Sequence, residues 1–323
     1  MRDGVGVLDL PGFTRLRLTG PGARAHLASL TASKLPQPGR TGLLYFADDC
    51  GRIVTEMTCL PFSDEDVGVI TAAVAQAHDA DILRKGLPEG MVLEDWTDRI
   101  HCFIVTGPRA RDLLAGIAEA DLTLPWLSVQ YFAKVAGKDV ALVRVSFAGE
   151  LGWEIHCDRE DAAHIYDALL AGGAKPFGMK ALNSLRIEKG YRAWKGDLST
   201  DYSLLEGGLD RFIDWSHDFP GKPALSAEKQ RGVKKRFVSL KVEAGEADAP
   251  YMSTLWHGGE VVGETTSGAW GYRVGHSMAL GMLRTDLAVP GTEVEVEIFG
   301  DRVKAVVLAD GPAWDAKNER IRA

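Results

Sequence analysis

Residues 15–30 read RLRLTGPGARAHLASL, and residues 102–117 read CFIVTGPRARDLLAGI. Each stretch is an apolar run, a Thr-Gly-Pro turn and a segment rich in alanine, arginine and leucine. Proline stiffens such a turn and favours the start of a helix. Chance use of a common turn is the alternative explanation, but apolar strands ahead of both copies of T-G-P-x-A-R-x-x-L favour duplication. We therefore expect two related α+β units.

Short strands and two helices account for the chain around these copies. Between the copies, polar turns separate strands at 42–47, 52–60 and 66–72, which predicts an antiparallel meander. After the second copy we expect strands at 129–135 and 140–146 and helices at 160–171 and 179–189, which end at glycines. Beyond residue 232, alternating runs and Gly-rich turns predict a small β-barrel or sandwich, with strands at 236–242, 260–265, 278–283, 292–298 and 302–308.

Composition sets limits on the class of protein. The chain has 323 residues, of which 46% are hydrophobic and 25% charged, as is ordinary for a globular protein. No apolar stretch reaches the roughly 18–20 residues that a membrane helix needs, and the N-terminus has no signal-peptide pattern. The net charge of −8 argues against a nucleic-acid surface. The four cysteines are Cys50, Cys59, Cys102 and Cys157, and their spacing is not that of a metal site. This spacing predicts reduced thiols and a cytoplasmic protein.

Several familiar site motifs are missing from the sequence. It contains no G-x-G-x-x-G, P-loop, G-x-S-x-G, H-E-x-x-H or H-x-H pattern. His78, which precedes Asp79, is more typical of a capping or packing residue than of a ligand. The chain therefore gives no support to flavin, nucleotide or zinc chemistry, and we predict no metal site.

The stretch SFAGELGWEIH at 146–156 places an acid in a strand-forming run, because Glu154 lies between Trp153 and Ile155. Burial of an unpaired carboxylate costs several kcal/mol, so Glu154 needs a cationic partner or a ligand rich in N–H donors. Arg186, on the helix expected at 179–189, is the natural counter-charge. Two interpretations stay open: an internal salt bridge, or a Glu154 that accepts paired N–H donors from a heterocycle while Arg186 contacts another polar part of it.

A second acid, Glu56, lies in the strand expected at 52–60. Strand alternation puts Ile53 and Thr55 on one side and Val54 and Glu56 on the other. Glu56 is then either a solvent-facing edge residue or a catalytic carboxylate near developing positive charge.

Motifs along nearly the whole chain are similar to those of a known family. They are VGVLDL (5–10), GRIVTEMTCL (51–60), GELGWE (149–154), SLRIEKGYRAW (184–194), LEGGL (205–209), TSG (266–268) and ALG (279–281). In this order they resemble the folate-binding aminomethyltransferases typified by the glycine cleavage T-protein. Within this family the sequence most resembles the folate domain at the C-terminal end of dimethylglycine and sarcosine dehydrogenases.

The resemblance implies an α+β cloverleaf: two related folate-binding α+β units and a C-terminal antiparallel β-barrel around a channel that admits tetrahydrofolate. On this basis we assign residues 1–40 and 135–230 to one α+β unit, residues 41–134 to the second and residues 231–323 to the barrel.

The resemblance also implies roles for particular residues. Glu154 would bind the pterin edge, and Arg186 and Trp194 would contact folate. A carboxylate at the position of Glu56, usually aspartate in relatives, is the key catalytic group. It would stabilise charge and help proton movement while a folate nitrogen captures an aminomethyl group or iminium carbon, giving methylene-tetrahydrofolate.

Further positions follow from the same comparison. The anionic folate tail would meet Arg192, Lys195 and Arg273 at the mouth of the channel. Glu206 matches a recurrent acid of the family for which we assign no role.

The chain departs from the family pattern near the expected pterin. Glu56 is one methylene longer than aspartate, which moves its carboxylate by about 1.5 Å, and a misplacement of about 1 Å can lower a rate roughly 100-fold. Phe147 stands where relatives carry a tyrosine. The tyrosine expected before the Gly51 turn falls at Leu43, with Tyr45 two residues on, and Asn183 replaces a frequent aspartate.

The leading functional hypothesis is a tetrahydrofolate-dependent one-carbon transferase that serves N-demethylation of a methylated amine. One alternative is a non-catalytic folate-binding subunit of a flavin demethylase or oxidase complex, which the altered Glu56, Phe147 and Leu43 favour. Another is a methyltransferase or demethylase that acts on a different methyl donor. The folate-dependent iron–sulfur maintenance proteins of the superfamily carry a Lys-Gly-Cys signature, and the matching region at 219–225 has no cysteine.

The start of the chain suggests a partner. The T-protein has a few dozen residues ahead of the equivalent of Val5, and in the dehydrogenases a flavin domain precedes it. We therefore expect a separate flavin-containing oxidative subunit that releases the one-carbon unit.

Overall fold

In the computed structural model, which describes residues 1–309 and 311–323, both Thr-Gly-Pro segments form the predicted strand, turn and helix. β2 (Phe13–Thr19) leads into α1 (Ala23–Leu30), and β7 (Ile100–Thr106) leads into α3 (Ala110–Ala115). Gly20 and Gly107 share a positive φ, 119° and 128°. A Cβ at either would lie 2.5 or 2.4 Å from a backbone carbonyl oxygen, of Gly90 or of Gly4. Both turns therefore require glycine, which supports two related units.

The first unit is a five-stranded antiparallel sheet. In order across the sheet its strands are β3 (Gly42–Ala47), β4 (Ile53–Ser63), β5 (Asp66–Ala72), β2 and β6 (Val92–Asp95). The helices α1 and α2 (Gln76–Arg84) pack on one face through Leu27 and Leu83, which are fully buried. A short 3-10 turn, η1 (Ala73–Ala75), leads into α2.

The second unit is a seven-stranded sheet. Its strands run in the order β12 (Lys175–Pro176), β1 (Gly6–Asp9), β7, β11 (Gly152–Asp158), β10 (Lys138–Val143), β9 (Val129–Val135) and β8 (Ala118–Glu119). The helices α3 and α4 (Ala162–Ala171) cover its core, and the turn η2 (Arg159–Asp161) precedes α4. Trp153 of β11 is 1% exposed in this core.

The third unit is a closed barrel, as predicted. Its strands run in the order β13 (Lys235–Val242), β16 (His276–Arg284), β15 (Glu260–Gly271), β14 (Thr254–His257), β17 (Glu293–Ile298) and β18 (Asp301–Val307). Every pair is antiparallel. Closure leaves no sheet edge unpaired, and apolar side chains such as Leu240 and Val296 fill the interior.

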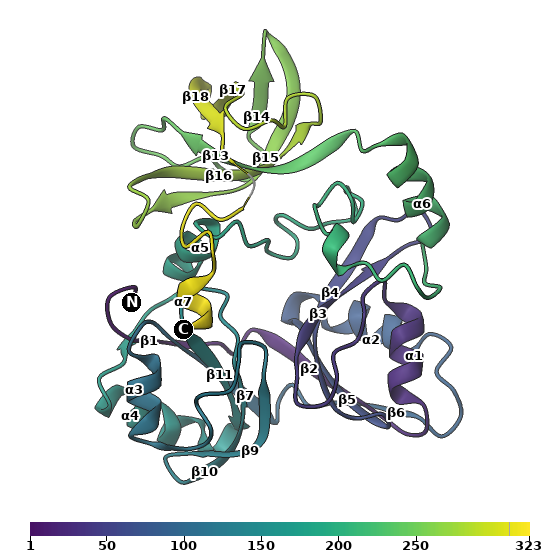
Figure 1. Cartoon of the computed structure of the whole chain (residues 1–323), viewed down its shortest axis with the longest axis vertical. Coiled ribbons are helices and arrows are strands. Elements are labelled where there is room, and N and C mark those ends of the chain that lie inside the picture. The colour runs from purple at the N-terminus through teal and green to yellow at the C-terminus, as the bar shows by residue number, and fades with distance from the viewer. Residues whose placement is uncertain (310) are drawn as a thin grey trace.

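The three units form a triangle, with the barrel at the top of Figure 1 and the two sheets below it. The connection from α5 (Met179–Ile187) to α6 (Lys222–Arg231) runs between them and includes the turn η3 (Asp210–Phe212). Leu198 and Leu204 of this connection are buried in one cluster with Tyr45 of β3 and Met282 of the barrel. The connection thus forms the packing at the centre of the molecule.

Strand pairing divides the chain differently from the predicted α+β units, which were residues 1–40 with 135–230 and residues 41–134. β2 pairs with β5 and β6, so residues 13–95 share one sheet. Of the first 40 residues only β1 joins the other sheet, where it pairs with β7 and β12. The hydrogen-bond ladders decide this membership, and they connect segments that lie far apart in sequence. β13, the first barrel strand, begins at Lys235, inside the range 231–323 assigned to the barrel.

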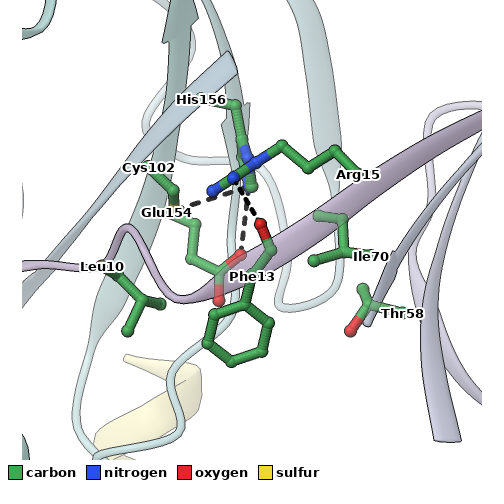
Figure 2. Close-up of a pocket in the computed structure, with 8 residues that line it drawn as sticks. All are labelled: Leu10, Phe13, Arg15, Thr58, Ile70, Cys102, Glu154 and His156. Atoms are coloured by element: carbon green, nitrogen blue, oxygen red, sulfur yellow. Dashed lines mark hydrogen bonds and ion pairs between the residues drawn. The ribbon is translucent and has the colours of Figure 1, made fainter. Parts of the chain in front are cut away.

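The two sheets pack against each other through apolar side chains. Leu60 and Ile70 of the five-stranded sheet form a cluster with Val129 and Val143 of the other, next to Phe13. Figure 2 shows this junction, with Thr58 and Ile70 facing Cys102 and Glu154. Side chains of both units therefore meet at one place.

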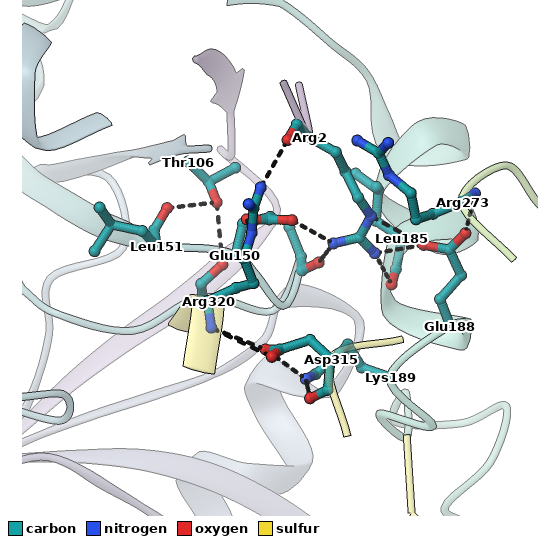
Figure 3. A network of polar contacts seen from close by, with 12 residues as sticks. Arg2, Thr106, Glu150, Leu151, Leu185, Glu188, Lys189, Arg273, Asp315 and Arg320 are labelled. Carbon is teal, nitrogen blue, oxygen red and sulfur yellow. Dashed lines mark hydrogen bonds and ion pairs between the residues drawn. The ribbon is translucent and has the colours of Figure 1, made fainter. Parts of the chain in front are cut away.

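A buried ion-pair network joins the chain ends to α5 (Figure 3). Arg2 donates to Glu188 at 2.5 and 3.0 Å and to Glu150 at 3.2 Å, and Arg320 donates to Glu150 at 3.0 Å. Arg320 lies in α7 (Glu319–Arg322). Glu150 is fully buried and pairs with both arginines. Glu150 of the GELGW motif therefore holds the two chain ends together.

Gly149 lets the chain reach this network. Its φ is 74°, and a Cβ there would lie 2.2 Å from Cγ of Lys189. Lys189 in turn donates to Asp315 and to Asn318 at 2.9 Å. Among the described residues, no helix is long and apolar enough to cross a membrane.

We predict that Glu150→Ala lowers the free energy of unfolding by about 3–5 kcal/mol, because it leaves Arg2 buried without one of its two carboxylates. Urea unfolding monitored by circular dichroism measures this change. Asp286→Ala is the matched control, because Asp286 pairs with Arg284 on the surface and is 61% exposed; its effect should stay below about 1 kcal/mol. Equal effects of the two substitutions would contradict the role of the network.

Candidate functional site

Glu56 lies on β4 directly opposite Tyr45 on β3. Its neighbours Thr55 and Met57 are buried on the other face, which confirms the predicted alternation. β4 lies between β3 and β5, so the alternative of an edge residue is wrong. Glu56 is half-buried instead, and its side chain shares a face with Tyr45.

The surroundings of Glu56 change its acidity. Burial raises the pKa of Glu56 to about 7, the Tyr45 hydrogen bond and the charge of Arg192 oppose the change, and the charge of Asp197 adds to it. Burial also raises the pKa of Tyr45 well above its ordinary value. The result is an acid that exchanges its proton near neutral pH, where a general acid or base works best.

Arg192 comes to Glu56 from the connection after α5. Its Nε donates to the carbonyl of Gly207 at 2.7 Å, and its guanidinium lies over the ring of Phe237 at 4.0 Å. Burial lowers the pKa of Arg192, and the charges of Asp197 and Glu56 oppose this change. Arg192 is half-buried beside Glu56, and its contact with a folate tail stays a prediction.

Arg186 pairs with Asp197, not with Glu154, so the salt bridge proposed from sequence is wrong. Arg186 is 3% exposed and its donors are taken by protein groups. They go to Asp197, to Asn183 Oδ1 at 2.7 and 2.9 Å, to the Tyr191 carbonyl at 2.9 Å and to Ser267 Oγ at 2.6 Å. Each guanidinium nitrogen of Arg186 thus already donates to a protein group. The predicted contact between Arg186 and folate stays a prediction.

Asp197 is a buried acid beside Arg186 that the sequence did not single out. It is fully buried and accepts hydrogen bonds from Arg186, from the Ala193 backbone and from Thr266 and Ser267 of β15. The TSG motif at 266–268 and the Lys-Gly-Asp that follows Trp194 were the available signals. Asp197 thus joins the connection after α5 to the barrel.

Glu154 projects from β11 into the junction between the two sheets (Figure 2). Its Oε2 lies 3.1 Å from Nε2 of His156, two residues on along the same face. A small cavity of about 30 Å³ adjoins it, lined by Leu10, Phe13, Arg15, Thr58, Ile70, Cys102, Glu154 and His156. The partner of Glu154 is therefore a histidine on its own strand, which strand alternation could have predicted.

Cys102, Glu154 and His156 place three possible metal-ligand atoms within 4.8 Å of one another. Strand pairing brings them together, because Cys102 lies opposite His156 in the ladder of β7 and β11. Burial raises the pKa of the Cys102 thiol well above its ordinary value, and the charge of Glu154 adds to this. Arg15 lines the same cavity, and its positive charge opposes a cation. We therefore base no proposal on a metal at this cluster.

The remaining predicted contacts lie in different surroundings. Phe147 stacks on Tyr191, with ring centroids 6.1 Å apart. Trp194 packs partly buried in the central cluster, and its Nε1 has no partner among the described residues. Leu43, on β3, is 39% exposed.

The two other cations expected at the channel mouth also have defined contacts. Arg273 donates to Asp3 at 2.5 Å and lies over the ring of Trp314 at 5.2 Å, near the N-terminal residues. Lys195 is exposed and lies 5.6 Å from the ring of Trp194. Neither contact tests binding of a folate tail.

A larger groove of about 570 Å³ lies between α5 and the barrel. Its lining residues are Met179, Lys180, Asn183, Ser184, Asp248, Gly268, Ala269, Trp270 and Tyr272. Asn183, which lines this groove, also accepts a hydrogen bond from Arg186. The groove therefore opens next to the group of residues that includes Asp197.

Two family descriptions match the chain. Residues 1–217 match the GCVT N-terminal domain, and residues 235–315 match the glycine cleavage T-protein C-terminal barrel domain. The chain belongs to the glycine cleavage T-protein family. The resemblance predicted from the sequence motifs is thus confirmed.

Individual members of the T-protein family are similar along most of the chain. Dimethylglycine dehydrogenase of Rattus norvegicus is 32% identical over 318 residues, which cover 95% of this chain and 37% of that protein. Aminomethyltransferase of Thermosynechococcus vestitus is 30% identical over 311 residues, with 95% and 84% covered. The chain therefore spans little more than a third of the dehydrogenase and most of the aminomethyltransferase.

A crystal structure shows the same T-protein fold. The glycine cleavage system aminomethyltransferase T from Bartonella henselae superposes with a TM-score of 0.86 at 21% identity, covering 98% of this chain and 88% of that one.

We predict that stability depends on pH through Glu56. Between pH 4.5 and about 7 the unfolded chain loses the Glu56 proton while the folded protein keeps it, so this residue lowers wild-type stability as pH rises. Glu56→Gln removes that loss. Relative to wild type, it should gain up to about 3 kcal/mol across this range and no more above it.

Urea unfolding at closely spaced pH values measures the difference. Glu94→Gln, an exposed residue of the same sheet, is the control and should give a flat difference. A flat difference for Glu56→Gln as well would show that Glu56 has an ordinary pKa.

Proposed function

We propose that this chain is a tetrahydrofolate-dependent one-carbon transferase, which captures the one-carbon unit released by N-demethylation of a methylated amine. The observation that carries the proposal is Glu56: an acid opposite Tyr45, close to Arg192 and Asp197, whose pKa is raised to about 7. The membership of the T-protein family and the named aminomethyltransferase relatives support it.

The polar groups around the site fit a reduced pterin. A pterin edge offers an amino group and a ring N–H, and Glu154 has one oxygen that accepts from His156 and one without a partner among the described residues. Trp194 Nε1 is a buried donor that has no partner within the part of the chain that the structure describes. Such unmatched donors and acceptors suit a heterocycle that carries both kinds of group.

Different residues of the chain would have different roles in the transfer reaction. Tetrahydrofolate, when bound, supplies a nucleophilic nitrogen that accepts the carbon. Glu56 would take up or release a proton beside the reacting carbon and, when ionised, stabilise positive charge there. Tyr45 would hold the Glu56 carboxyl in place, and Arg192 would keep part of the Glu56 population ionised.

A second candidate is a binding subunit that holds folate without turnover. The packing of Phe147 against Tyr191 favours it, because a phenyl ring at the proposed pterin side offers no hydroxyl. In this case Glu56 would stabilise bound folate without entering the reaction.

An oxidative partner forms part of the proposal. Two relatives are named as dehydrogenases: dimethylglycine dehydrogenase and, in Mus musculus, sarcosine dehydrogenase, which is 33% identical over 246 residues. Most of each dehydrogenase lies outside the match. We propose that a flavin-containing oxidoreductase supplies the one-carbon unit to this chain, and that both act in the cytoplasm.

We predict that Glu154→Gln weakens tetrahydrofolate binding roughly tenfold or more, because an amide offers one acceptor where the carboxylate offers two. Isothermal titration calorimetry under anaerobic conditions measures the affinity. Asp158→Asn, at the exposed end of the same strand, is the control and should bind like wild type. Unchanged affinity of Glu154→Gln would remove Glu154 from the site.

We predict that Glu56→Gln lowers the rate of methylene-tetrahydrofolate formation by about 100-fold or more while tetrahydrofolate affinity changes little, because a neutral amide neither accepts a proton nor stabilises positive charge. Rapid-quench assays with formaldehyde and an amine as the carbon source measure the rate. Equal rates in the two proteins would favour the binding subunit over the enzyme.

A further inference from the structure

Arg15 is a buried cation whose donors are only partly used. It lies on β2 and is 6% exposed. Its Nη1 donates to the carbonyl of Phe13 at 2.9 Å, whereas Nε and Nη2 are buried and, among the described residues, have only the Cys102 thiol, a weak acceptor, to interact with. A buried charged N–H group without an acceptor costs free energy, and native proteins rarely leave one unmatched. The site therefore needs an acceptor from elsewhere.

The unmatched donors belong to the same cavity as Glu154 (Figure 2). At about 30 Å³ the cavity exceeds the roughly 10–15 Å³ that one water needs, so it admits one or two oxygen-sized atoms but no ring. Leu10, Phe13 and Ile70 give it apolar walls. An oxygen on the edge of a larger ligand fits this space, with the rest of the ligand outside it.

Donor and acceptor together define a chemical pattern. Glu154 accepts from N–H groups, and Arg15 donates to an oxygen beside them. A cyclic amide presents this pattern, since its ring N–H is adjacent to its carbonyl. A 2-amino-4-oxopteridine adds an amino group on the other side of the same N–H.

We infer that Arg15 is a second recognition residue of the pterin site, which donates to the 4-carbonyl while Glu154 accepts from the neighbouring ring N–H and amino group. This inference rests on the proposed function and adds a specificity to it. A 4-amino analogue places a donor against the donors of Arg15 and lacks the ring N–H for Glu154. The site should therefore select 4-oxo over 4-amino pteridines.

The test compares tetrahydrofolate with tetrahydroaminopterin, which carries an amino group in place of the 4-carbonyl. Anaerobic calorimetry should give a wild-type preference for tetrahydrofolate of roughly tenfold or more. Arg15→Met should weaken tetrahydrofolate binding and clearly lower the ratio of the two affinities, and the preference that remains is the one set by Glu154. The ratio of the two affinities is informative, because a purely structural role of Arg15 would weaken the binding of both ligands by the same factor.

Arg17→Met is the matched control. Arg17 lies two residues along β2, on the same face, and its guanidinium already pairs with Asp66. It should keep the wild-type ratio. If circular dichroism shows that Arg15→Met does not fold, Arg15→Gln, which keeps one neutral donor, carries the same test and should show a reduced ratio.

Two failures can be told apart. If tetrahydrofolate binds to wild type and weakens in Glu154→Gln but Arg15→Met keeps the wild-type ratio, the inference about Arg15 is wrong and the proposed function stands. If tetrahydrofolate does not bind to wild type, the proposed function fails, and the inference fails with it.

Discussion

The buried pair of Arg186 and Asp197 is the interaction on which the centre of the molecule depends. Arg186 belongs to α5, Asp197 to the connection that follows, and Ser267 of β15 bonds to both. Removal of either charge would leave the other buried without its partner, which costs more than the pair contributes when intact. The pair therefore fixes where the connection runs, and with it the place of Arg192 beside Glu56.

This arrangement explains how one acid acquires an unusual pKa. Glu56 and Tyr45 come from neighbouring strands of one unit, but the charges that act on Glu56 come from the connection after α5. Burial alone would disfavour the ionised form strongly. Because the Tyr45 hydrogen bond and, to a smaller extent, the charge of Arg192 oppose that effect, the carboxyl titrates near neutral pH. The acidity of Glu56 is thus a property of the assembled units.

Sequence reasoning succeeded where the pattern is local. The strand, turn and helix of each Thr-Gly-Pro copy, the alternation around Glu56 and four of the barrel strands follow from nearest-neighbour geometry, and the structure has them within a few residues of the expected bounds. The sequence did not predict β14, and β15 continues to Gly271, past the expected end at residue 265. It failed for the partner of Glu154. Charge type alone favours Arg186 as the partner, whereas His156 on the same strand face lies within hydrogen-bond distance.

The sequence by itself determined the elements, the two related units, the barrel and the family, because turns, periodicity and motifs are encoded within short segments. Only the tertiary structure decided that β2 joins the sheet of residues 13–95, that Asp197 forms an ion pair with Arg186, and that Arg15 lines the same cavity as Glu154. These facts depend on which strands pair and which faces pack, and many pairings satisfy the same local pattern. Burial then selects among them, since each buried charge requires a partner that lies far away in the sequence.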